Sequence, residues 1–178
     1  MRAISQSYRS DEWWGQADGK VRRRLVRQPR HPQPPFTENL QAEITGRMSA
    51  ERLRILRDPA VAIAEAVGAI TDSFQAHEAL LRVFLLLGTR HEAVRAEGSR
   101  VSLEGNRHFT EALRHTPVAH PNPEAALDFA YRLIYATIAH RITQGEFLES
   151  DRPLPWTELR SHLQTAVASY LLDAPSGH

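Results

Sequence analysis

The segment NPEAALDFAYRLIYATIAHRITQG, residues 122–145, decides the fold. Asn122 followed by Pro123 is a strong helix-start signal, because asparagine caps the first backbone N–H groups and proline fits the first helical position. No further proline or glycine interrupts the run before Gly145. The segment therefore predicts one helix of about 22 residues, or about 33 Å.

Apolar side chains occupy two opposite sides of this helix. The first side carries Leu127, Tyr131, Ile134 and Ile138, and the second carries Phe129, Leu133, Ala136 and His140. A helix that is apolar on two sides needs two packing partners. The domain itself can supply one partner, and we expect a second copy of the chain to supply the other. His140 is accordingly expected to be a hydrogen-bonded core or interface residue rather than a metal ligand.

A last helix is predicted after this segment, opened by Pro153, Pro155 and Thr157 and ending before Pro175. Its apolar stripe consists of Leu159, Leu163, Val167, Tyr170 and Leu171. The opposite side carries Arg160, Gln164 and Ser169, which we expect to be exposed because a surface helix buries only its apolar face.

Helices are also predicted upstream. Thr37 is expected to cap a helix that runs to Arg57, and Asp58-Pro59 is a second cap-and-proline start. The helix after Pro59 places Ile63, Val67, Ile70 and Phe74 on one face. A break near residues 75–77 then leads into a very apolar helix, 78–87, which is closed by Gly88 and expected to be buried on nearly all sides.

A more polar helix is predicted from about residue 90 to residue 115. Its inward stripe contains Gly98 and Gly105. Glycine costs about 1 kcal/mol relative to alanine inside a helix, so we expect these two positions to leave room for another backbone or for a small molecule. No stretch alternates with the period of two that indicates a strand. The sequence therefore predicts an all-α domain spanning residues 37–174.

Residues 1–36 differ from this domain in charge and in proline content. Eight basic and three acidic residues precede Glu38, giving a net charge of +5, whereas the rest of the chain carries −4. Four prolines fall within Pro29–Pro35 and forbid a regular helix there. We interpret the segment as an extended or disordered, solvated one. The alternative is a degenerate DNA-binding region, in which Arg22, Arg23, Arg24 and Arg27 contact phosphates.

Several function classes find no support in the sequence. The chain has no cysteine, and none of its nine histidines stands at metal-site spacing with an acid in place. No nucleophile elbow or phosphate-binding glycine loop occurs, so we expect no enzyme, metal or cofactor. The longest apolar run, Val83–Leu87, is far shorter than a membrane span. We therefore expect a cytoplasmic protein without a membrane partner.

The order of these helices resembles the C-terminal regulatory domain of the tetracycline-repressor (TetR/AcrR) family. The resemblance is carried by a connecting helix from Leu40 to Arg57 and by the segments DPAVAIAEAVGAI, HEALLRVFLLLGTRHEAVRA, PEAALDFAYRLIYATIAHRITQGE and WTELRSHLQTAVASYLL. It covers residues 38–172 as distributed patterning without an invariant motif. The family's DNA-reading head, about three helices ending in an aromatic turn, has no counterpart in VRRRLVRQPRHPQPP, and no base-contacting position is matched.

The resemblance implies two kinds of site. The last two helices would form a homodimer interface through Leu127, Ile134, Ile138, Leu163, Val167 and Tyr170. The preceding helices would enclose a small apolar or aromatic ligand among Phe74, Leu81, Phe84, Phe109, Tyr131 and Tyr135. From the residues alone a plain hydrophobic core explains the second set equally well.

The predicted function is a ligand-responsive regulator. The alternatives are a helical dimer that sequesters a related regulator without binding DNA and, third, a small helical enzyme. The sequence leaves open the ligand, the operator and the sign of regulation. It also leaves open whether the N-terminal segment is a truncated or frame-shifted remnant.

Overall fold

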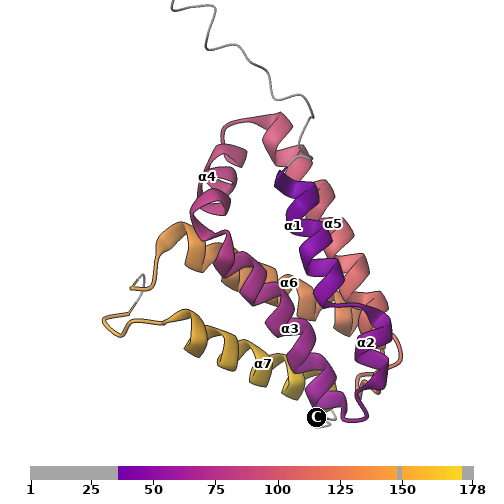
Figure 1. The fold of residues 1–178 in the computed structure, drawn as a ribbon. Coiled ribbons are helices and arrows are strands. Elements are labelled where there is room, and N and C mark those ends of the chain that lie inside the picture. Colours follow the sequence, from indigo (N-terminus) through magenta and orange to yellow (C-terminus); the bar gives the residue numbers. More distant parts are fainter. Residues whose placement is uncertain (1–35, 148–149, 174–178) are drawn as a thin grey trace, which may run out of the picture. The chain divides into compact units, whose positions relative to one another are not determined.

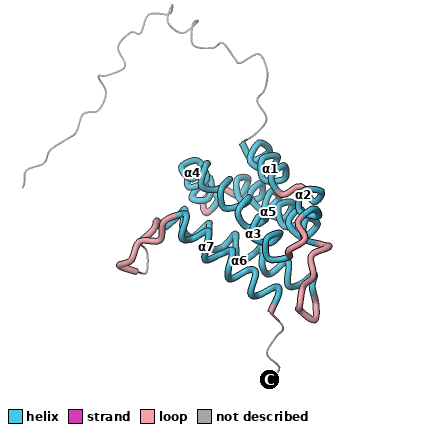
Figure 2. The backbone as a smooth tube through the Cα atoms, turned by 60° about the horizontal axis from the view of Figure 1, so that its bottom comes forward, coloured by secondary structure: helices cyan, strands magenta, loops and turns pink. Residues whose placement is uncertain are grey.

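The computed structural model describes residues 36–147 and 150–173, and every regular element within these ranges is an α-helix. The predicted all-α fold is confirmed, and Figure 2 shows only helices and loops in the described ranges. In chain order the helices are α1 (Phe36–Arg47), α2 (Ala50–Ile55), α3 (Pro59–Ala76), α4 (Glu78–Gly88), α5 (Glu92–Leu113), α6 (Pro123–Gln144) and α7 (Trp156–Leu172) (Figure 1). Residues 1–35, with the predicted phosphate-contacting arginines, lie outside the described residues.

Capping residues set the predicted helix ends. The Asp58 side chain accepts a hydrogen bond of 2.8 Å from the Ala60 N–H at the start of α3. The Asn122 side chain accepts one of 3.1 Å from the Ala125 N–H at the start of α6. Gly145, with φ of 90°, ends α6 in a conformation that few residues other than glycine adopt. These starts and this stop are confirmed.

The single helix predicted from Thr37 to Arg57 was wrong. Ser49 interrupts it, because its side chain accepts a hydrogen bond of 3.2 Å from the Arg52 N–H and caps the separate helix α2. Thr37 is not a cap either: it lies inside α1, and its hydroxyl donates a hydrogen bond of 2.8 Å to Glu97 on α5. Local side-chain hydrogen bonds here outweigh the apolar periodicity that favoured one long helix.

The central helix α3 packs against α1 on one side and α7 on the other (Figure 1). Arg160 Nη1 of α7 donates to Asp72 Oδ1 at 2.9 Å, and Gln164 Nε2 donates to the Ala64 carbonyl at 2.8 Å. Gly68 has no side chain, which leaves space for the Arg160 guanidinium. A Cβ at this position would lie 2.7 Å from Arg160 Nη2. The predicted exposed side is therefore confirmed for Ser169 and wrong for Arg160 and Gln164, which are half-buried against α3.

The prediction that α4 is buried on nearly all sides was also wrong. Leu81 is its only fully buried residue. Four other apolar side chains are 41–53% exposed: Leu80, Val83, Leu86 and Leu87. The reason is that α4 packs on α5 and α6 by one side only, so its opposite side has no covering element among the described residues.

A polar cluster fixes the first turn of α4 to α6 and α7. Trp156 Nε1 donates to Glu78 Oε2 at 2.9 Å, and Arg141 Nη1 lies 3.5 Å from Glu78 Oε1. The Arg141 guanidinium also lies over the Trp156 ring, 5.3 Å from its centroid. The first turn of α4 is thus held by charge-assisted hydrogen bonds, whereas its later turns are half-exposed.

In residues 36–147 and 150–173, no helix combines the length and the apolar character that crossing a membrane requires.

Candidate functional site

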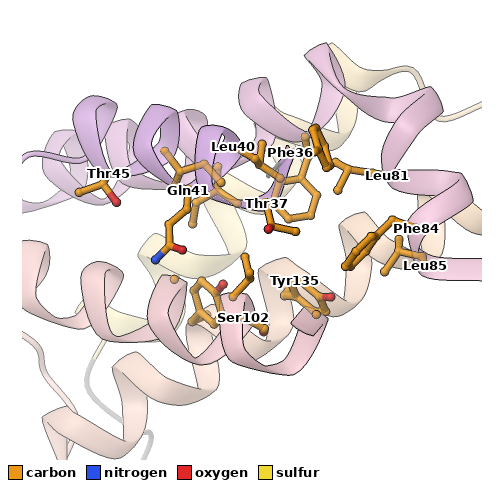
Figure 3. A pocket seen from close by; sticks show the side chains of 17 residues that line it. Phe36, Thr37, Leu40, Gln41, Thr45, Leu81, Phe84, Leu85, Ser102 and Tyr135 are labelled. Atoms are coloured by element: carbon orange, nitrogen blue, oxygen red, sulfur yellow. The ribbon is translucent and has the colours of Figure 1, made fainter. Parts of the chain in front are cut away.

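A cavity of about 50 Å³ lies between α1, α3, α4, α5 and α6 (Figure 3). Space of this size holds a few water molecules. No acidic, basic or histidine side chain lines it. Its apolar wall consists of Phe36, Leu40, Ile44, Ile70, Phe74, Leu81, Phe84, Leu85 and Val101. We name this space the inner cavity.

Five of the six residues predicted to surround a ligand line the inner cavity. They are Phe74, Leu81, Phe84, Tyr131 and Tyr135. The sixth, Phe109, does not: it is 0% exposed in the core, and its ring lies 5.9 Å from that of Tyr131. Phe109 follows Gly105 by one turn of α5, which places it in the core beneath the cavity.

Polar atoms at the cavity come from six residues: Thr37, Gln41, Thr45, Ser102, Tyr131 and Tyr135. Burial raises the pKa of Tyr131 to about 12, although a hydrogen bond with Ser102 opposes part of that shift. Burial also raises the pKa of Tyr135. Both phenols are therefore protonated at neutral pH and can donate hydrogen bonds.

The Gln41 side chain extends from α1 toward α5 at the edge of the cavity (Figure 3). The amide lowers the pKa of Glu104 on α5, so these two groups attract each other. Its Nε2 atom is nevertheless buried without a hydrogen-bond partner in acceptable geometry. A ligand that accepts a hydrogen bond at this position would give the Nε2 atom a better-aligned partner than Glu104.

The first turn of α1 is fixed to α5 by a charged group at the cavity rim. Glu97 accepts hydrogen bonds from Arg100 Nη2 and from the Thr37 hydroxyl, both at 2.8 Å. These bonds, with Arg100 the larger cause, lower the pKa of Glu97 to about 2. Sequence reasoning missed α1 as a cavity wall. The four-residue spacing of Leu40 and Ile44 indicated an apolar face but not the helix that this face covers.

Both glycines on α5 border aromatic side chains of the cavity. A Cβ at Gly98 would lie 3.2 Å from Phe84 Cε1, and a Cβ at Gly105 would collide with the Tyr131 hydroxyl. The expectation that these glycines leave room for another backbone or for a small molecule was wrong at these two positions, because Phe84 and Tyr131 of the same chain occupy the space. The room is taken by aromatic rings rather than by another backbone.

A second candidate site is the outer face of α6 and α7, which we define as Phe129, Leu133, Ala136 and Tyr170. Phe129 is 51% exposed, and its ring lies 5.2 Å from that of the half-buried Tyr170. Leu133 is half-buried and Ala136 is exposed. His140 lies exposed on the same side of α6, which excludes the core, and its expected place at an interface stays a prediction.

Five of the six predicted interface residues were wrong. Leu127, Ile134, Ile138, Leu163 and Val167 are at most 5% exposed within a single copy of the chain. These side chains already pack into the core and have no surface left for a second copy. Of the predicted set only Tyr170 remains accessible. The prediction chose the side of α6 that packs into the core of its own chain, and the accessible side is the other one.

No group of three or more histidine, aspartate or glutamate side chains in the described part of the chain could hold a metal ion. Comparison with known proteins gives no match, whether to a family model, to a curated protein or to a solved structure. Functional inference therefore rests on the geometry of the inner cavity and of the outer face.

Substituting Gly105→Ala is expected to destabilise the protein, because the new methyl group collides with the Tyr131 hydroxyl. Overpacking costs about 1–3 kcal/mol, which exceeds the gain of about 1 kcal/mol in helix propensity. The cost should be smaller in a Tyr131→Phe background, which lacks the hydroxyl. Urea denaturation of the four proteins measures this difference. A Gly105→Ala variant that is more stable than wild type in both backgrounds would contradict the geometry.

Acid is expected to weaken the contact between α1 and α5. The pKa of Glu97 falls from 4.5 in the unfolded chain to about 2 in the folded one. Its stabilising contribution is therefore complete above about pH 4.5 and is lost as pH falls through 2. Glu97→Gln should give a shallower loss of melting temperature between pH 5 and pH 2.5 than wild type. Glu111→Gln, an exposed change on the same helix, is the control. An equal loss of melting temperature per pH unit in wild type and in Glu97→Gln would refute the stabilising role of the Glu97 carboxylate.

Proposed function

We propose that this protein is a homodimeric, ligand-responsive transcription regulator of the tetracycline-repressor type. The observation that carries the proposal is that one helix, α6, walls the uncharged inner cavity and also leaves an apolar face uncovered. Tyr131 and Tyr135 point to the cavity side, and Phe129 and Ala136 lie on the outer side. A helix shared by a ligand site and a subunit contact allows occupancy of one to change the free energy of the other.

The walls of the inner cavity favour a mainly apolar ligand. Aromatic and aliphatic side chains dominate, and a few convergent polar groups can fix the orientation of a bound molecule. The protonated phenols of Tyr131 and Tyr135 offer donors, and the buried Gln41 amide offers one more. A small apolar or aromatic molecule with hydrogen-bond acceptors satisfies both requirements.

The outer face supports self-association. Phe129 and Tyr170 form an accessible aromatic pair, and Leu133 and Ala136 extend the apolar surface along α6. Aromatic residues are enriched in the buried centres of protein interfaces. A twofold contact between two copies of this face would cover the second apolar side of α6, which one copy leaves in water.

The DNA contact would belong to the N-terminal segment, through phosphates and Arg22, Arg23, Arg24 and Arg27. A second candidate, sequestration of a related regulator in mixed dimers, is favoured by one observation. The outer face lies wholly on α6 and α7 and requires nothing from residues 1–35. A salt-dependent shift of duplex DNA by the full chain, lost when residues 1–35 are removed, distinguishes the regulator from the sequestering partner.

The subunit contact is tested by placing a charge on the outer face. Phe129→Asp is expected to convert a dimer into a monomer, because burying an unpaired carboxylate is strongly unfavourable. The control is Leu103→Asp on α5, where the leucine is 69% exposed. Sedimentation velocity at micromolar concentration measures the mass. A monomeric wild type, or a Phe129→Asp variant that remains dimeric, would refute the proposed contact.

Ligand uptake is tested with N-phenyl-1-naphthylamine, a neutral dye whose fluorescence rises in apolar surroundings. Saturable binding of one dye per chain is expected. Ser102→Phe should abolish it, because the added ring fills the inner cavity that Ser102 lines. Leu103→Phe places the same ring on the exposed neighbouring position and should bind dye normally. Absence of saturable binding to the wild type, or equal binding to both variants, would exclude the cavity as the ligand site.

A further inference from the structure

The inner cavity is smaller than the ligand that the proposed function requires. Its volume is about 50 Å³, whereas pockets for small molecules measure roughly 300–1,000 Å³. A ligand can therefore enter only if a wall moves or if the cavity joins neighbouring space. The structure offers one such neighbour.

An outer groove of about 290 Å³ lies against the inner cavity, between α4, α5 and α6. The two spaces share five residues: Phe84, Leu85, Gly98, Ser102 and Tyr135. The walls that belong to the groove alone include Thr89, Arg95 and Ser99. The inner cavity and the outer groove together reach the lower end of the volume range of ligand pockets.

Phe84 forms part of the partition between the two spaces. Its ring faces Gly98 across the partition, and a Cβ at that position would lie 3.2 Å from Phe84 Cε1. The glycine therefore admits the ring to its present position. Displacing this one side chain opens the inner cavity toward the groove.

The part of α4 that carries Phe84 is weakly embedded. Val83, Leu86 and Leu87 around it are 53%, 50% and 41% exposed. The preceding residues, in contrast, are tied: Glu78 accepts a hydrogen bond from Trp156 on α7, and Arg82 Nε donates to the Ile142 carbonyl on α6 at 2.6 Å. Segments with few buried apolar contacts open at low free-energy cost. Movement of α4 beyond Arg82, with the preceding residues fixed, is the least costly way to move Phe84.

The two spaces differ in chemistry. The inner cavity is apolar and has no charged side chain in its wall. The outer groove is lined by the hydroxyl residues Thr89 and Ser99 and by Arg95, an exposed residue whose guanidinium forms no ion pair with another described residue. A molecule lying across both spaces would place an apolar part inside and meet a positive charge at the outer end.

We propose that the site takes an amphipathic ligand with one anionic end. The apolar part occupies the inner cavity, the anionic group lies in the outer groove beside Arg95, and Phe84 turns aside to join the two spaces. This inference rests on the proposed ligand-sensing function and specifies the ligand class and the residue that controls access.

Displacement of N-phenyl-1-naphthylamine by decanoate and by decanol tests the anionic end. Both competitors have the same chain length and differ in charge. Arg95→Gln is expected to weaken the binding of decanoate about three- to fivefold, as for the loss of a partly solvated ion pair. The binding of decanol should not change. Arg90→Gln removes a charge from the neighbouring turn and should change neither competitor.

The outcomes separate this inference from the proposed function. If the dye binds but decanoate does not displace it, or if Arg95→Gln leaves decanoate unaffected, the amphipathic ligand is excluded while ligand sensing stands. If the dye itself does not bind, both fail. A decanoate affinity that falls equally in Arg95→Gln and Arg90→Gln would show only a general charge effect and would overturn the assignment of the head group.

Stopped-flow fluorescence tests the role of Phe84. Phe84→Leu and Phe84→Ala are expected to raise the association rate of the dye severalfold, because a smaller side chain obstructs the inner cavity less. Val83→Ala, an exposed change on the same turn, should leave the rate unchanged. Circular dichroism confirms that each variant is folded. An unchanged or slower rate in the folded Phe84→Leu variant would contradict the gating role.

Discussion

The constraint on which the structure depends is that α6 cannot hide two apolar sides within one copy of the chain. Ile134 and Ile138 are 0% exposed and occupy the core, and Tyr131 and Tyr135 reach the inner cavity. Phe129 and Ala136 are left on the outside by the same helical geometry. The 22 residues of α6 therefore contribute side chains to the core, to the inner cavity and to the surface from a single helix.

The inner cavity follows from how the other helices meet α6. One side of α3 packs against α7 through Asp72 and Arg160, and its other side contributes Ile70 and Phe74 to the cavity wall beside α1, α4 and α5. The glycines of α5 accommodate aromatic rings at that junction, and Gln41 brings an unsatisfied donor to its edge. A plain core would fill such space with apolar atoms at native density. An uncharged cavity with donors in its wall favours a binding role.

Capping residues in the sequence predicted where α3 and α6 begin. Which side chains are buried depends on packing between helices, and the sequence predicted only part of that correctly. The side chains of Asp58 and Asn122 accept hydrogen bonds from backbone N–H groups only two or three residues further along the chain. The local sequence is therefore enough to identify these caps. Burial depends on neighbours that local sequence does not name. Periodicity therefore found both apolar sides of α6 but could not tell which one faces inward. The same limit explains Gln164, whose polar side chain packs on α3, and Phe109, which lies in the core rather than at the cavity.

The central claim is that two copies meet through the outer face of α6 and α7, and cysteine cross-linking tests it most directly. The chain contains no cysteine, so single substitutions report on one position each. Cysteines placed in turn at Phe129, Leu133 and Ala136 should include at least one position that forms a disulfide-linked dimer in mild oxidant. Cysteine at Val83, exposed on α4, should not. Cross-linking at Val83 with none on α6 would contradict the account.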